Sequence, residues 1–336
     1  MKLRTFFSIV AGIALAIVVY VSREDIAQAW RQLPDANPWL ILMIVPTQLL
    51  GYHFNTRMYS SYFRAFSNKL DYLPLYKLSL ELNFVNNVFP SGGISTASYM
   101  SYRLKKWRVS TSKAALAVIA RFAMTFVTFL VLLATALLFM LIGGVINTTV
   151  IFIAGMVSLI IVFIITISTY ILRDRARITN LMKIIARFIN WVVNRIHIKK
   201  GAAIDLKKVE SIFNDLADDY QIIMSQRREI LLPTFYALLN NLTEVLTIYW
   251  VYLAFGEAVN FGAVIIAYAV ANFAGAVAAI PGGLGVYESM LTIVMVSAGV
   301  PAGLSLTVAV VYRIINMSVF LPIGYTLYHR GLKEGD

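Results

Sequence analysis

The sequence predicts an all-α polytopic membrane protein, built as an inverted-topology repeat with two opposed re-entrant broken helices. Hydrophobic residues make up 59% of its 336 residues, and the mean hydropathy is +0.74, a level that few soluble domains approach. Several apolar runs reach the roughly 18 residues needed to cross a bilayer. Two long apolar stretches are interrupted by proline and paired glycines, and an arginine follows each interruption at a similar distance.

The first apolar run, Phe6–Val21, resembles either a signal peptide or a first membrane span. The charged residues Arg23, Glu24 and Asp25 stand where a signal peptide has a short neutral region before its cleavage site. We therefore expect an uncleaved first span.

Six continuous spans are predicted from length and hydropathy, over residues 5–22, 38–56, 114–142, 149–172, 231–255 and 304–328. The two interrupted stretches cover residues 75–104 and 261–300. Proline and paired glycines end a helix and free backbone groups that lipid cannot satisfy. A broken helix in this setting is expected to be buried in protein or to face a wet cavity.

Positive charge predicts the topology, because the cytoplasmic loops of membrane proteins are rich in Lys and Arg. Segments 57–77 and 103–113 are strongly basic, so the stretch between them should enter and leave from the cytoplasm. The loop 173–230 and the tail from Arg330 are also basic, which makes the stretch 261–300 enter from the other side. Opposed re-entrant segments indicate an inverted-topology repeat, here in a plasma membrane protein with both termini cytoplasmic.

The predicted organisation has four parts. An N-terminal membrane half covers residues 1–172, and a C-terminal membrane half covers residues 231–330, followed by a tail over 331–336. Between the halves, residues 173–230 show the apolar periodicity of a cytoplasmic amphipathic helical hairpin. We expect this hairpin to pack on the bundle, and the alternative is a module that binds a regulatory or enzyme partner.

Several classes of function are excluded by composition. The chain has no cysteine, which removes disulfides and thiolate metal sites, and its three histidines form no cluster with acids. No nucleophile–histidine–acid pattern, Walker loop or nucleotide fingerprint occurs, so we expect neither an enzyme nor a cofactor. The net charge of +12 is concentrated beside the spans, and it therefore reports topology and predicts no nucleic-acid partner.

The candidate binding site is formed by the two breaks and the arginines that follow them. Each break restarts a helix, and a helix N-terminus offers unpaired N–H groups and a partial positive charge to an anion. If the repeat is inverted, both N-termini meet near the membrane centre beside the two arginines. That arrangement suits a phosphate-bearing lipid headgroup, whereas the alternative is that each break only kinks a helix for packing. The residues concerned are Gly92, Gly93, Arg121, Gly282, Gly283 and Arg313.

Acids and amides near the breaks complete the candidate site. Glu244 and Glu288 are able to pair with an arginine, bind a cationic headgroup or carry a coupling proton, and the sequence leaves these roles open. Asparagines precede both breaks, where they would either cap freed carbonyl groups or contact a polar headgroup; they are Asn83, Asn86 and Asn87 before the first break and Asn272 before the second.

Two motifs resemble a known family. The segment Pro281–Glu288 (PGGLGVYE) closely resembles the signature of the membrane domain of lysylphosphatidylglycerol synthetase/flippase proteins and their stand-alone flippase-like relatives. The segment Asn87–Gly93 (NVFPSGG) with Arg121 is similar to that family's earlier motif, and Arg313 matches its arginine in the last long span. The resemblance covers about residues 5–330 and adds Tyr287, within the second motif, to the candidate binding residues.

The resemblance implies phospholipid translocation between leaflets, with membrane phospholipids as the partner and a homodimer left open. Many members have Glu before the first arginine and an acid shortly after it, where this chain has Ala120 and Thr125. The aminoacyl-transferring domain of bifunctional members would follow the last span; because the sequence stops at Asp336, synthase activity is expected to be absent.

Three functions therefore compete. The leading one is a phospholipid or lipid-linked-precursor flippase that binds an anionic headgroup between two broken helices. The second is a non-transporting scaffold that presents the hairpin to a separate lipid-modifying enzyme. The third is an ion-coupled transporter of a small solute that uses the same broken helices.

Overall fold

The computed structural model describes residues 33–89, 93–142, 147–172, 218–221, 227–278 and 283–334, together with positions 20, 24, 27, 31, 174 and 177. This part of the chain is helical and contains no strand, which confirms the all-α prediction for it. The predicted first span and most of the predicted hairpin lie outside the described residues, as do Gly92 and Gly282.

The described helices follow one another with short connections. Two 3-10 turns, η1 (Leu33–Asp35) and η2 (Lys105–Trp107), accompany the α-helices. The α-helices are α3 (Pro38–Leu42), α4 (Ile44–Ala65), α5 (Tyr72–Val88), α6 (Ile94–Leu104), α7 (Thr111–Ile142), α8 (Thr148–Leu172), α11 (Arg227–Ala254), α12 (Phe261–Ala278), α13 (Val286–Ser297) and α14 (Ala302–Glu334).

Four of these helices are long and apolar enough to cross a membrane: α7, α8, α12 and α14. This finding and the helix bounds agree with a multi-pass membrane protein. The bounds of the predicted spans 114–142, 149–172, 231–255 and 304–328 match those of the helices α7, α8, α11 and α14 to within a few residues at most ends, but α11 is not one of the four apolar candidates.

The predicted span 38–56 has the wrong bounds. The helix breaks at Met43, after a short α3 that begins at the Asn37 cap, whose side chain accepts a hydrogen bond from Trp39 N at 3.0 Å. It then runs on past the expected end to Ala65. Arg57 ends the apolar run in the sequence, but the helix continues past this residue. The Arg57 guanidinium lies 5.3 Å from the ring centroid of Tyr72 on α5.

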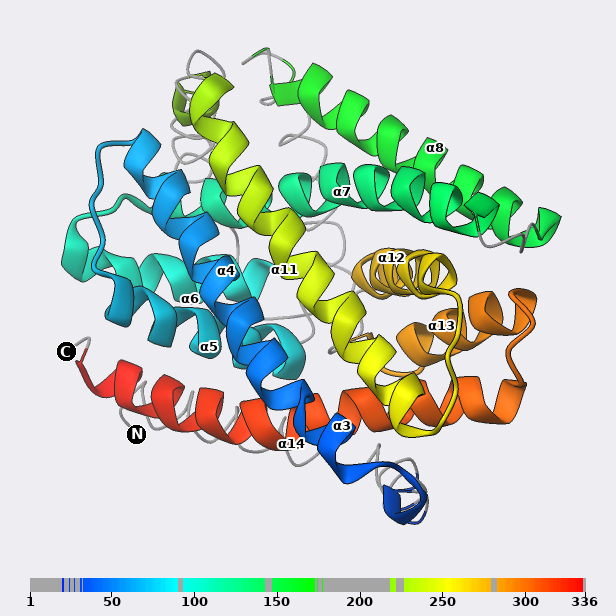
Figure 1. Cartoon of the computed structure of the whole chain (residues 1–336). Helices are drawn as coiled ribbons and strands as arrows, with labels where there is room; N and C mark the ends of the chain where they lie inside the picture. Colours follow the sequence, from blue (N-terminus) through cyan, green and yellow to red (C-terminus); the bar gives the residue numbers. More distant parts are fainter. Residues whose placement is uncertain are drawn as a thin grey trace, which may run out of the picture.

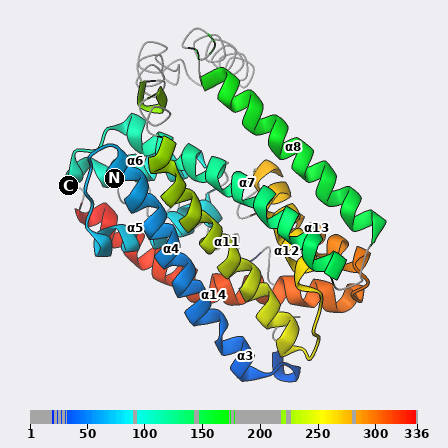
Figure 2. The ribbon, with the colours of Figure 1, turned by 45° about the horizontal axis from the view of Figure 1, so that its top comes forward.

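Helices α4 and α11 form the middle of the bundle. They make the most extensive helix–helix contact among the described elements, and both views show them side by side, with α5 and α6 on one side and α12 and α13 on the other (Figure 1, Figure 2). Helix α5 packs on α6 and α14, while α12 packs on α13 and α7. Helix α8 lies at the edge of the bundle against α7, α12 and α13 (Figure 1).

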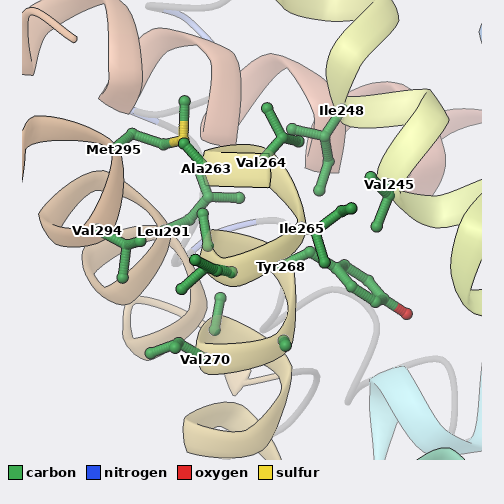
Figure 3. Close-up of a cluster of buried hydrophobic side chains, with 14 of the residues drawn as sticks. Val245, Ile248, Ala263, Val264, Ile265, Tyr268, Val270, Leu291, Val294 and Met295 are labelled. Carbon is green, nitrogen blue, oxygen red and sulfur yellow. The ribbon is translucent and has the colours of Figure 1, made fainter. Parts of the chain in front are cut away.

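The larger hydrophobic core surrounds α12. Nearly every residue from Gly262 to Ala271 is buried, in contact with apolar side chains of α11 and α13 (Figure 3). Small residues permit this close packing, as they commonly do between membrane helices. A Cβ on Gly262 would lie 2.5 Å from the carbonyl oxygen of Ala136 on α7. Helix α12 is therefore enclosed by its neighbours over this stretch, whereas Ala276 and Val277 near its end are exposed.

Both expected breaks interrupt a helix. After α5 the chain resumes at Gly93, with φ +94°, and after α12 it resumes through Gly283 and Gly285, with φ +67° and +79°. These left-handed conformations suit glycine. Helices α6 and α13 contain 11 and 12 residues. At 1.5 Å per residue each is only about 17 Å long, too short to cross the roughly 30 Å hydrocarbon core alone.

Candidate functional site

A cavity of about 480 Å³ is lined by helices from the first and the last parts of the described chain. Its wall is built by α5, α7, α11, α12 and α14, with Ile164 from α8 and with Gly283 and Tyr287 from the start of the second restarted segment. Arg121 and Arg313 both line it, although 192 positions of sequence numbering (313 − 121) separate them.

The cavity brings together most of the residues selected from the sequence. Those that line it are Arg121, Arg313, Glu244, Asn83, Asn86, Asn87, Asn272, Gly283 and Tyr287. Glu288 does not line it and instead pairs with Arg313. Gly93 is buried at the start of α6, where a Cβ would lie 2.9 Å from the Phe122 ring. The structure therefore separates residues of the cavity wall from residues that support it.

Arg313 has a carboxylate partner. Its guanidinium forms a buried ion pair with Glu288 of α13, and each side chain is only 10% exposed. The other oxygen of Glu288 accepts a hydrogen bond from Gly285 N at 2.8 Å, which caps the start of α13. The Arg313 guanidinium also lies 5.9 Å from the ring centroid of Tyr287. Arg313 is thus largely neutralised and joins α14 to α13.

Arg121 differs from Arg313 in its bonding partners. Within the part of the chain that the structure describes, its guanidinium makes no hydrogen bond or ion pair. The residue 25 positions before Arg313 is Glu288, but the residue 25 positions before Arg121 is Thr96. Thr96 is 2% exposed, and its hydroxyl has no hydrogen-bond partner among the described residues. An intramembrane arginine normally pairs or lines a cavity, and Arg121 lines the cavity with its donors open.

Glu244 is anchored at the cavity wall by neutral donors. Its Oε2 accepts hydrogen bonds from Gln48 Nε2 at 2.9 Å and from the Tyr312 hydroxyl at 2.6 Å. Gln48 also donates to Thr247 Oγ1 at 3.1 Å, so α4, α11 and α14 are linked through one carboxylate. The Oε1 atom of Glu244 makes no hydrogen bond to a described residue, and Arg121 attracts the carboxylate electrostatically.

Other polar groups of the wall were missed from the sequence. They are Asn240, Asn241, Asn316, Tyr268 and Tyr312. Asn241 donates to Thr128 Oγ1 at 2.6 Å and accepts from the Tyr268 hydroxyl at 2.9 Å, which links α11 to α7 and α12. An asparagine within an apolar span was an available signal for Asn240 and Asn316. Their convergence on one cavity depends on long-range packing, which no local pattern shows.

One side of the cavity is apolar. Phe122, Phe126 and Phe129 follow one another along α7, with ring centroids 6.5 and 6.2 Å apart. Val277 of α12 also lines the cavity and is 65% exposed, so the apolar lining includes an exposed side chain. The cavity therefore offers a charged and amide-rich wall together with an apolar wall.

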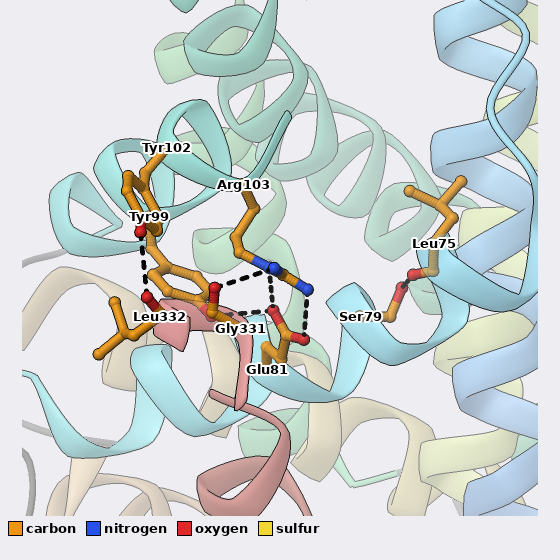
Figure 4. Close-up of polar contacts among 8 residues, drawn as sticks. All are labelled: Leu75, Ser79, Glu81, Tyr99, Tyr102, Arg103, Gly331 and Leu332. Atoms are coloured by element: carbon orange, nitrogen blue, oxygen red, sulfur yellow. Dashed lines mark hydrogen bonds and ion pairs between the residues drawn. The ribbon is translucent and has the colours of Figure 1, made fainter. Parts of the chain in front are cut away.

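A second buried ion pair lies away from the cavity. Arg103 of α6 donates to both carboxylate oxygens of Glu81 on α5, at 2.9 and 3.1 Å, and to the Gly331 carbonyl near the end of α14 at 3.1 Å (Figure 4). Tyr99 donates to Glu81 at 2.9 Å. This cluster anchors the end of α6 to α5 and α14. Sequence reasoning did not identify this pair.

Comparisons with known proteins agree with this architecture. The family model described as the lysylphosphatidylglycerol synthase TM region matches residues 6–324. Two curated proteins of Methanothermobacter thermautotrophicus, both described as UPF0104 membrane protein, are similar to the chain. One is 23% identical over 333 residues, covering 96% of this chain and 94% of the relative. The other is 40% identical over 88 residues, 26% of each chain. No solved structure matches the chain.

Proposed function

We propose that this chain, which belongs to the family of the lysylphosphatidylglycerol synthase TM region, moves an anionic phospholipid or lipid-linked precursor between leaflets through its central cavity. The observation that carries the proposal is the position of Arg121 in the cavity wall. This arginine lines a cavity at the meeting point of two broken helices and makes no hydrogen bond or ion pair with a described residue, although the Glu244 carboxylate of the same wall attracts it. A guanidinium in this setting offers several N–H donors to a phosphate, the group it binds with two parallel hydrogen bonds.

The mixed lining of the cavity supports a lipid substrate. The polar wall suits a headgroup, and the row of Phe122, Phe126 and Phe129 suits the glycerol and upper acyl region beside it. Val277 continues the apolar lining to the exposed side of α12, where an acyl chain would leave the cavity for the surrounding bilayer. A water-soluble solute would gain little from such a wall.

The proposal includes an inverted-topology repeat with two re-entrant segments, in a plasma membrane protein with cytoplasmic termini. Exchange of α4, α5, α6 and α7 with α11, α12, α13 and α14 preserves the main packing pattern. Helix α5 packs on α14 as α12 packs on α7, and α6 packs on α7 as α13 packs on α14. In transporters with this symmetry the substrate site lies at the repeat interface, and the lining of the cavity by helices of both proposed repeats supports this assignment.

Glu244 supports a second candidate function. A carboxylate with one unbonded oxygen, facing a cavity within the membrane, is the type of group that carries a coupling ion or proton. An ion-coupled transporter of a small anionic solute would also use Arg121. The apolar wall favours the lipid, and the two candidates differ in whether movement requires a membrane-embedded substrate.

The proposed function is tested in liposomes that contain the purified protein and a trace of phosphatidylglycerol with a fluorescent acyl chain. Dithionite reports how fast label leaves the inner leaflet. We expect Arg121→Ala to slow this movement at least about tenfold, because it removes a charge-assisted contact of about 1.5–3 kcal/mol. Arg57→Ala, which changes an arginine stacked on Tyr72 outside the cavity, is the matched control and should retain the native rate.

Two results would contradict the proposal. One is native protein that moves label no faster than protein-free liposomes under any applied ion gradient. The other is an Arg121→Ala variant that moves label at the native rate. Uptake of a soluble anion driven by an ion gradient, with no movement of lipid, would instead favour the second candidate.

A further inference from the structure

The cavity wall is unusually rich in amide side chains. Seven asparagines line it, and they come from α5, α11, α12 and α14, so they surround the space from several directions. A phosphate bound to Arg121 accounts for the positive charge of the site but not for its amides. The amides need a separate explanation, because polar side chains within a membrane are costly unless they find partners.

Several of these amides retain unused hydrogen-bonding capacity. The side chains of Asn86, Asn240 and Asn316 make no hydrogen bond to another described residue. Asn87 and Asn272 use their NH2 groups within their own helices, to Asn83 and to the Tyr268 carbonyl, and make no described bond through their side-chain oxygens. The wall therefore presents both donors and acceptors to whatever occupies the cavity.

This combination selects among headgroup chemistries. A phosphate only accepts hydrogen bonds, a primary ammonium only donates them, and a trimethylammonium does neither. A hydroxyl donates and accepts, as an amide does. A wall that carries several donor–acceptor amides is therefore matched by a ligand with several hydroxyl groups.

Aromatic rings complete the wall beside the amides. Tyr287 and Tyr312 are stacked with centroids 6.0 Å apart, and both line the cavity. Tyr287 is 8% exposed, and its hydroxyl oxygen is buried within the protein, so the ring and not the hydroxyl faces the cavity. Phe129 and Tyr268 meet edge to face at 5.7 Å on another side. Flat aromatic surfaces provide apolar contact for the C–H faces of a ring.

We infer that the headgroup is a phosphate bearing a sugar or cyclitol ring, with Arg121 binding the phosphate and Asn240 and Asn316 binding the ring hydroxyls. This inference rests on the proposed function, because it assigns a substrate class to the same cavity. It adds that discrimination between lipids of equal charge depends on the amides.

The inference is tested with two anionic lipids that carry the same fluorescent acyl chain and the same single phosphate charge. Phosphatidylinositol carries a polyhydroxylated ring, whereas phosphatidylbutanol carries an alkyl chain. In proteoliposomes we expect phosphatidylinositol to move at least about tenfold faster, because a site built for hydroxyls is left with unpaired amides by the analogue. Phosphatidylglycerol, which has two hydroxyls and no ring, should fall between them.

The variants Asn240→Leu and Asn316→Leu assign the effect to the amides. Leu has the branched shape of Asn but no hydrogen-bonding group, so each variant should slow phosphatidylinositol severalfold more than phosphatidylbutanol. Phosphatidylbutanol thus serves as the folding control within each variant. Retention of the native preference in both variants would overturn the assignment.

The outcomes distinguish a failure of the ring inference from a failure of the proposed function. Equal rates for phosphatidylinositol and phosphatidylbutanol, both lost in Arg121→Ala, would overturn the ring inference and leave the proposed function standing; the amides would then be hydrated by water. No movement of either lipid above protein-free liposomes would contradict the proposed function itself.

Discussion

At the scale of single residues, the two arginines of the cavity have unequal roles despite their equivalent places in the chain. Arg313 is bound by Glu288, which also caps α13, so its charge is used within the protein. Arg121 has Thr96 at the corresponding spacing and keeps its donors for the cavity. A threonine hydroxyl carries no charge and cannot neutralise a guanidinium. The asymmetry makes the first-half arginine the one available to an anion.

A substitution at Thr96 tests this asymmetry. Thr96→Glu places a carboxylate where the second half has Glu288, and we expect it to pair with Arg121 and slow lipid movement at least about tenfold. Thr96→Gln is the matched control, because it has the same size without the charge. Both should cost about 1–3 kcal/mol of stability through overpacking. Equal transport rates in the two folded variants would show that Arg121 does not need to be unpaired.

Sequence reasoning found the arginines through local signals. Proline and paired glycines mark a break wherever they occur in an apolar run, and the distance to the next arginine is read directly from the chain. The pairing of Arg103 with Glu81 and the hydrogen bond from Tyr312 to Glu244 were not predictable in this way. Both interactions depend on which helices become neighbours in the fold. Tyr312 and Glu244 are also separated by many residues along the chain.

At the scale of helices, α14 shows how closely the elements pack. A Cβ on Gly324 would lie 2.7 Å from Phe84 Cβ and 2.8 Å from the Leu80 carbonyl oxygen, both on α5. The backbones of α5 and α14 approach each other at this point, which is the role small residues commonly have between membrane helices. The same helix contains Gly303, around whose Cβ position no heavy atom lies within 4 Å.

We therefore expect Gly324→Ala to destabilise the protein by about 1–3 kcal/mol, because the helix pair must separate to admit the methyl group. Gly303→Ala should be neutral or stabilising by up to about 1 kcal/mol, since alanine has the higher helix propensity. Thermal unfolding of both variants in the same detergent measures the difference. A Gly324→Ala variant as stable as Gly303→Ala would contradict the close approach of α5 and α14.

The observed helix ends show where local hydropathy patterns predict the bounds of a helix correctly and where they do not. Helices α7, α8 and α14 are long uninterrupted apolar runs, and their ends fall close to the expected ones. Helix α4 was misplaced because it is the least apolar of the long helices and packs polar residues such as Gln48 and Asn55 inward. Hydropathy is a poor guide for such a helix, since its environment is set by α11.

At the scale of the whole molecule, helices α5, α7, α11, α12, α13 and α14 surround a cavity with two arginines, an amide wall and an apolar side. The proposed inverted topology requires the loop between α4 and α5 to be cytoplasmic and the loop between α11 and α12 to lie on the opposite side. Both loops are exposed, at Lys69 and at Glu257.

The absence of cysteine from the sequence makes this topology directly testable. Single variants Lys69→Cys and Glu257→Cys each introduce one thiol at an exposed position. In intact cells a membrane-impermeant maleimide should label only the Glu257→Cys variant, and permeabilisation should expose the other. Labelling of both or of only Lys69→Cys in intact cells would contradict the proposed orientation.

The central claim is that Arg121 binds the phosphate of a lipid headgroup between the two breaks. The measurement that tests it most directly is a high-resolution structure of the protein in a lipid bilayer nanodisc that contains phosphatidylinositol. The account predicts headgroup density in the cavity, with its phosphate within hydrogen-bonding distance of the Arg121 guanidinium. A dry, fully packed centre, or an Arg121 paired with a protein carboxylate in place of a lipid, would contradict it.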